Sequence, residues 1–158
     1  MLAAVSASLE EIAFDASVRA LDHQEGTLAE LRARTGVLLA ASSLAVAFLG
    51  VPAARSDRPL ALLGALGAFG VSIGASGWVL VPRSAFTFSI TGAAVFQRLY
   101  PYRHDSAEIY RRLAYDLARY WHANALAMRS LERAFRLAAS SLAVEIALLL
   151  VAAGDTLL

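Results

Sequence analysis

The sequence predicts an all-α, polytopic membrane protein in which three transmembrane helices are joined to a cytosolic helical stalk. Three runs are almost free of charged residues: 35–52, 59–82 and 137–154. Each is near the ~20 residues that cross a hydrocarbon core about 30 Å thick. Of the 158 residues, 58% are hydrophobic, which exceeds the roughly half that is usual for soluble domains. A soluble bundle is the alternative, but its buried helices seldom stay apolar on every face.

We treat residues 1–158 as a single domain whose N-terminal segment, residues 1–34, is a cytosolic helix that continues into the first span. No proline occurs between Ser6 and Arg34, and leucines recur on one helical face. We expect the combined helix to end at Pro52. Acidic residues interrupt the N-terminus, so it does not resemble a cleaved signal peptide: Glu10, Glu11 and Asp15.

The second span, residues 59–82, carries a stripe of glycines along one helical face. They are Gly64, Gly67, Gly70, Gly74 and Gly77, at spacings of three, three, four and three. In lipid, small residues let helix backbones approach closely. The stripe therefore predicts a packing surface, within one subunit or between subunits. The alternative is that glycine is simply common in membrane helices.

The connector, residues 83–104, has an uncharged stretch that is too short to cross a membrane. We expect it to be interfacial or packed on the stalk. The connector contains five aromatic residues, with Trp78 nearby: Phe86, Phe88, Phe96, Tyr100 and Tyr102. They form either an aromatic belt at the inner membrane surface or part of the core of the stalk.

The last segment predicts one continuous helix from about Ser106 to Ala153. Asp105 is the expected N-cap, with Glu108 at the third helical position. Neither glycine nor proline occurs from there until Gly154. Residues 105–136 are assigned to the cytosol and residues 137–154 to the third span.

Arginine counts predict the orientation in the membrane. Residues 1–34 and 83–136 share a side and hold twelve arginines (three and nine), whereas the 55–58 turn holds two. The positive-inside rule puts the larger group in the cytoplasm. We therefore expect a multi-pass protein of the cell inner membrane with a cytoplasmic N-terminus and an external C-terminus.

Glu145 is the one charged residue in the third run, about 13 Å along the helix from Arg136. Counting from the span ends puts four serines near its depth: Ser42, Ser43, Ser72 and, slightly inward, Ser76. A carboxylate facing lipid costs at least ~2.5 kcal/mol. Two hypotheses follow. A neutral Glu145 ties the spans together through a serine, or copies from several subunits line a cation path.

The sequence gives little support to enzyme chemistry, so we expect no catalytic residue, no metal and no cofactor. There is no cysteine, and the histidines are dispersed at positions 23, 104 and 122. A net charge of +1 gives no case for nucleic-acid binding. Arg133 and Arg136 are expected near lipid headgroups or an acidic partner. A solvated helix face is the alternative for the other arginines of this helix.

The layout resembles the membrane effectors of bacterial nucleotide-signalling immunity, namely the Pycsar-type transmembrane effectors and the related SLATT proteins. A helix enters the first span in "LRARTGVLLAASSLAVAFLG", a glycine-rich span follows, and a long helix enters the last span. Along that last helix lies a loose pattern of polar, basic and acidic residues: Asn124, Arg129, Arg136 and Glu145. The likeness covers residues 20–153.

The resemblance implies an oligomeric protein that perturbs the membrane, in antiphage defence, when a cyclic-nucleotide signal arrives. The sequence departs from it because no cyclic-nucleotide-binding domain is recognisable. Either the stalk senses the signal, or a partner sensor protein does, or the protein is not an effector. The alternatives are a membrane anchor or adaptor whose cytosolic helices dock another protein, and a constitutive ion channel. In each case the lipid bilayer is a partner, and we expect a homo-oligomer.

Overall fold

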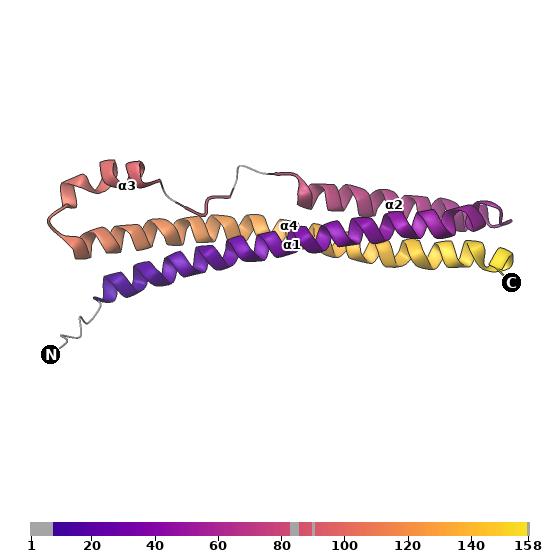
Figure 1. Ribbon diagram of the computed structural model, residues 1–158, viewed down its shortest axis with the longest axis horizontal. Coiled ribbons are helices and arrows are strands. Elements are labelled where there is room, and N and C mark those ends of the chain that lie inside the picture. The colour runs from indigo at the N-terminus through magenta and orange to yellow at the C-terminus, as the bar shows by residue number, and fades with distance from the viewer. Residues whose placement is uncertain (1–7, 83–85, 90, 158) are drawn as a thin grey trace. The chain divides into compact units, whose positions relative to one another are not determined.

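The computed structural model describes residues 8–82, 86–89 and 91–157, and this part of the chain is all-helical. Helix α1 spans Leu9–Ala54, α2 Pro59–Leu80, α3 Gly92–Leu99 and α4 Ser106–Leu157, with a 3-10 turn, η1, at Tyr100–Tyr102 (Figure 1). In this part, α1, α2 and α4 are long and apolar enough to cross a membrane. The predicted all-α class with three such helices is confirmed. The start of the N-terminal segment (1–7) and parts of the connector (83–85 and 90) lie outside the described residues.

Side-chain caps lie at the starts of α1 and α4. The backbone N–H of Glu108 donates to Asp105 Oδ1 at 3.1 Å, which confirms the expected N-cap of α4. Ser8 caps α1 in the same way, because its Oγ accepts the N–H of Glu11 at 3.2 Å. Pro52 lies inside α1, which ends two residues later than expected. A proline in the last turn removes only one helical hydrogen bond and already has a helical φ.

The chain divides into two compact units, to which α1 and α4 each contribute one part. Unit 1 comprises residues 1–28 and 83–128, and unit 2 comprises residues 29–82 and 129–158.

In unit 1, α3 and the first part of α1 pack against the first part of α4. Leu21, Leu99 and Leu117 are buried, and the rings of Phe14 and Tyr110 lie 5.5 Å apart. An ion pair of 2.8 Å between Arg98 and Asp116 holds α3 to α4. Apolar burial and one charged pair thus fix the short helix on the long one.

Two buried amides also hold unit 1 together. The Nε2 of Gln24, on α1, donates to the carbonyl oxygen of Trp121, on α4, at 3.1 Å. Asn124 is 1% exposed and binds the connector twice. Its Nδ2 donates to the carbonyl oxygen of Thr87 at 2.9 Å, and its Oδ1 accepts the N–H of Thr87 at 3.2 Å. The Asn124 amide therefore satisfies both backbone polar groups of Thr87, much as a paired strand would.

The connector is irregular over residues 86–89, and its aromatic residues divide into two groups. Phe86 and Phe88 are half-buried, with rings stacked 5.7 Å apart. Phe96 and Tyr100 are 66% and 49% exposed. The first pair packs in unit 1, and the second remains on its surface.

Unit 2 is a three-helix bundle in which α2 lies beside the later parts of α1 and α4 (Figure 1). Its core consists mainly of alanines, which allow the three helices to approach closely: Ala53, Ala65, Leu149, Ala152 and Ala153. The turn between α1 and α2 is tied to α4, because Nη1 of Arg58 donates to the carbonyl oxygen of Val151 at 2.9 Å.

We expect Asn124→Ala to release the connector, because both polar groups of Thr87 would lose their partner. A buried unsatisfied group costs about 1–3 kcal/mol. Hydrogen exchange of the Thr87 amide should speed up strongly, with smaller changes elsewhere. The control is His122→Ala, at an exposed position on the same helix. Unchanged exchange at Thr87 in Asn124→Ala would contradict this assignment.

Candidate buried carboxyl site

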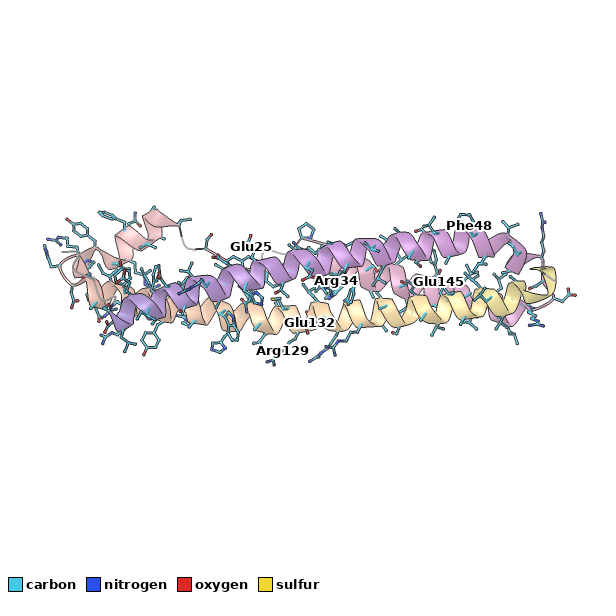
Figure 2. All side chains as sticks on the ribbon, turned by 60° about the horizontal axis from the view of Figure 1, so that its bottom comes forward. Glu25, Arg34, Phe48, Arg129, Glu132 and Glu145 are labelled. Atoms are coloured by element: carbon cyan, nitrogen blue, oxygen red, sulfur yellow. The ribbon has the colours of Figure 1, made fainter. Side chains whose placement is uncertain are left out.

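The candidate site lies in unit 2, where the carboxyl of Glu145 on α4 meets the hydroxyl of Ser42 on α1. The Ser42 hydroxyl donates to Glu145 Oε2 at 2.6 Å, within the usual range for such bonds. Both side chains are 0% exposed. Figure 2 shows Glu145 on the side of α4 that faces α1, whereas Phe48, 74% exposed, lies on the outer side of α1. Glu145 is thus enclosed by its own chain.

Only half of this carboxyl is satisfied. Glu145 Oε1 is buried and has no hydrogen-bond partner among the residues that the structure describes. An isolated ionised carboxylate in apolar surroundings is very costly unless it is paired, and a serine hydroxyl supplies one neutral hydrogen bond. Burial of this carboxyl is therefore unfavourable for the free energy of folding.

The four predicted serines separate into different environments. Ser43 is exposed and donates to the carbonyl oxygen of Leu39 on its own helix, so it does not reach Glu145. Ser72 is buried on α2 and donates to the carbonyl oxygen of Ala138 at 3.4 Å. Ser76 is fully buried, and its Oγ has no partner within the described part of the chain.

Ser72, which was expected at the depth of Glu145, is not bonded to it. Its acceptor is the carbonyl oxygen of Ala138, seven residues before Glu145 on α4. Counting residues from the span ends can place polar residues near one depth, but it does not say which of them are bonded. The structure brings together Ser42 and Glu145, and it bonds Ser72 to Ala138.

The glycine stripe of α2 faces away from the buried face of that helix. Ala65, Ser72, Ser76 and Val79 are buried, whereas the first four glycines are exposed and Gly77 is half-exposed. A Cβ added at Gly64 would meet Leu148 Cδ1 at 3.0 Å, but one added at the other four would meet nothing within 4 Å. The close approach of helices predicted for this stripe does not occur within the chain at Gly67, Gly70, Gly74 or Gly77.

The remaining candidate residues lie on the surface. Arg133 and Arg136 are exposed on α4. Within the described residues, no group of three or more His, Asp or Glu side chains is placed to hold a metal ion.

Sequence reasoning missed the contacts of Gln24 and assigned Asn124 no structural partner. Both residues lie in apolar series, Gln24 between Leu21 and Leu28, and Asn124 between Tyr120 and Met128. A polar side chain inside such a series predicts a buried, hydrogen-bonded group. The sequence therefore indicated that Gln24 and Asn124 are buried and hydrogen-bonded, but it did not indicate which groups they bind.

Comparison of the chain with models of known protein families, with curated proteins and with solved structures gives no match.

We expect Ser42→Ala to lower the free energy of unfolding in detergent micelles by about 0.6–2 kcal/mol, the range measured for hydrogen bonds between membrane helices. The second oxygen of Glu145 already lacks a partner, so this substitution leaves the whole carboxyl unsatisfied. Ser43→Ala is the matched control and should have little effect, because Ser43 is exposed. Equal effects of the two substitutions would show that the Ser42–Glu145 bond contributes nothing.

Proposed function

We propose that this chain is a membrane effector that spans the bilayer three times, assembles into homo-oligomers and opens or perturbs the membrane. Three helices of sufficient length and apolarity support insertion. The excess of arginine in residues 1–34 and 83–136 supports a cytoplasmic N-terminus and an external C-terminus in the cell inner membrane. In this arrangement, unit 1 holds the stalk and unit 2 the spans.

The exposed glycines of α2 support assembly through that helix. Four of them have open space around them, and a smooth glycine face lets a second helix come close enough for extensive van der Waals contact. Because α2 buries its opposite face within its own chain, the glycine face remains available to another copy.

We expect Gly74→Leu to lower the oligomer mass in mild detergent while leaving helix content unchanged. The added side chain meets nothing within the chain, but it would hold a neighbouring helix away. Gly36→Leu, on α1, is the matched control because it is also exposed and also has open space around it. An unchanged mass for Gly74→Leu would contradict assembly through this face.

The observation that carries the effector proposal is the half-satisfied, fully buried carboxyl of Glu145. In a passive anchor, an apolar residue of similar size would fill this position without a buried polar group to satisfy. Because Ser42 covers Glu145, a path lined by this carboxyl requires α1 and α4 to separate at that level. The protein we propose is therefore gated, and the described arrangement is closed around Glu145.

The layout shared with nucleotide-signalled effectors suggests antiphage defence as the setting, with a cyclic nucleotide or a sensor protein as the trigger. A constitutive ion channel would differ in needing no trigger.

We expect purified protein in potassium-loaded vesicles to release potassium on addition of a cyclic nucleotide, whereas release without any addition would favour the constitutive channel. Glu145→Gln should reduce the selectivity for cations over anions, because glutamine keeps the shape of the side chain but cannot carry its charge. Ser43→Ala should leave the flux unchanged. Vesicles that stay tight under all these conditions would contradict the effector proposal.

A second candidate function is a membrane anchor or adaptor, which is favoured by exposed apolar side chains in unit 1. Leu9, Ile12 and Tyr115 are 77%, 53% and 70% exposed, and a groove of about 310 Å³ runs between Leu9 on α1 and Tyr115 on α4. Apolar patches on a water-facing segment mark sites of association. Tight vesicles together with a defined stalk partner would favour this alternative.

A further inference from the structure

A second apolar groove lies in unit 2, on the surface between α1 and α2. Its volume is about 520 Å³. One side of the groove runs from Val46 past Gly50 on α1 to Arg55 in the turn that follows, and Leu66 belongs to its α2 side. Glycine and alanine make it hollow, because they leave space where larger side chains would fill it. Arg55, at the end of the groove, is its charged lining residue and is exposed.

We propose that this groove binds one acyl chain of an anionic phospholipid of the outer leaflet, with its phosphate held by Arg55. The inference rests on the membrane insertion put forward above, and it adds a specific lipid as a ligand. Two observations support it, namely the length of the groove and the charge at its end.

The length of the groove matches a single leaflet. The end of α1 at Ala54 follows Val46 by eight residues, which is about 12 Å along the helix, and Arg55 is the next residue. Half of a hydrocarbon core about 30 Å thick is close to this value. An acyl chain entering beside Arg55 would therefore reach Val46 with its methyl end near mid-bilayer.

The charge at the outer end suits a phosphate. A guanidinium binds phosphate oxygens in a bidentate manner, and Arg55 stands where the headgroup of such a lipid would lie. The same turn contains Asp57 and Arg58, so its net charge is +1 (two Arg, one Asp). Arg58 donates to the carbonyl oxygen of Val151, which leaves Arg55 as the better-placed phosphate ligand.

The charge also argues against a second copy of the chain as the occupant. Copies inserted in the same orientation bring their 55–58 turns to the same height, so a copy seated in the groove would place two cationic turns side by side. A lipid phosphate neutralises this charge. The glycine face of α2 offers a second copy an uncharged surface.

A lipid in the groove would lie next to the buried carboxyl site. Val46 follows Ser42 by about one helical turn, and Leu149, which also lines the groove, follows Glu145 by about one turn. An acyl chain there would exclude water from the outer side of the Ser42–Glu145 pair. The bound lipid would thus stabilise the closed arrangement, in which Ser42 covers Glu145.

The test is native mass spectrometry of the full-length protein, delipidated and then titrated with phosphatidylglycerol or phosphatidylcholine. We expect one phosphatidylglycerol per chain to bind with preference over phosphatidylcholine. Gly50→Leu should abolish most of this binding, because its side chain would enter the groove. Arg55→Gln should reduce the preference about fivefold, as expected for one cation at a membrane surface.

Gly36→Leu and Arg19→Gln, which lie on α1 outside the groove, are the matched controls and should bind as the unmodified protein does. Equal binding of both lipids, or undiminished binding by Gly50→Leu, would overturn the inference. A fall in oligomer mass in Gly50→Leu without loss of lipid would also overturn it and would assign the groove to a second copy.

The outcome distinguishes this inference from the proposed function. Protein that fractionates with membranes but retains no lipid in the groove overturns only the lipid site. Protein recovered from the soluble fraction overturns the membrane assignment itself.

Discussion

A buried carboxyl needs a hydrogen-bond partner, and in unit 2 the partner of Glu145 is a hydroxyl from a helix 103 residues earlier in the chain. The two helices run parallel here, and the bond favours the alignment that puts Ser42 opposite Glu145. The alanine-rich core on the same helices then allows the close approach on which a bond of 2.6 Å depends. In unit 1, the side chain of Gln24 on α1 likewise bonds to the carbonyl oxygen of Trp121 on α4. In each unit a polar side chain links α1 to α4 and favours one alignment of the two helices.

The two faces of α2 differ in what they contact. Ser72 and Ser76 lie on the buried face, and the glycines lie on the opposite, open face. A single helix can thus pack against its own chain and still present a smooth surface to another. The apolar groove lies at the N-terminal part of α2, about one helical turn from the Ser42–Glu145 pair on α1 and α4. We propose a gate as the function of such a group.

The position of Glu145 in the candidate site was predictable, because a single acidic residue in an apolar run can be recognised without knowing how the helices align. Its partner was not predictable. Four serines lay near the expected depth, and neighbouring positions such as Ser42 and Ser43 point to different sides of one helix. The glycine stripe shows the same limit: its periodicity predicts a packing surface, but it does not say whether the surface meets the same chain or another.

By itself, the sequence determined the helices, because uninterrupted apolar runs, capping residues and the absence of glycine and proline act locally. It also determined that Glu145 and the glycine stripe are exceptional. Only the tertiary structure decided that Ser42 binds Glu145, that Ser72 faces Ala138 instead, and that Asn124 holds the connector at Thr87. These outcomes depend on how far one helix slides and turns against another. That displacement is set by the packing of many side chains at once, and no local pattern records it.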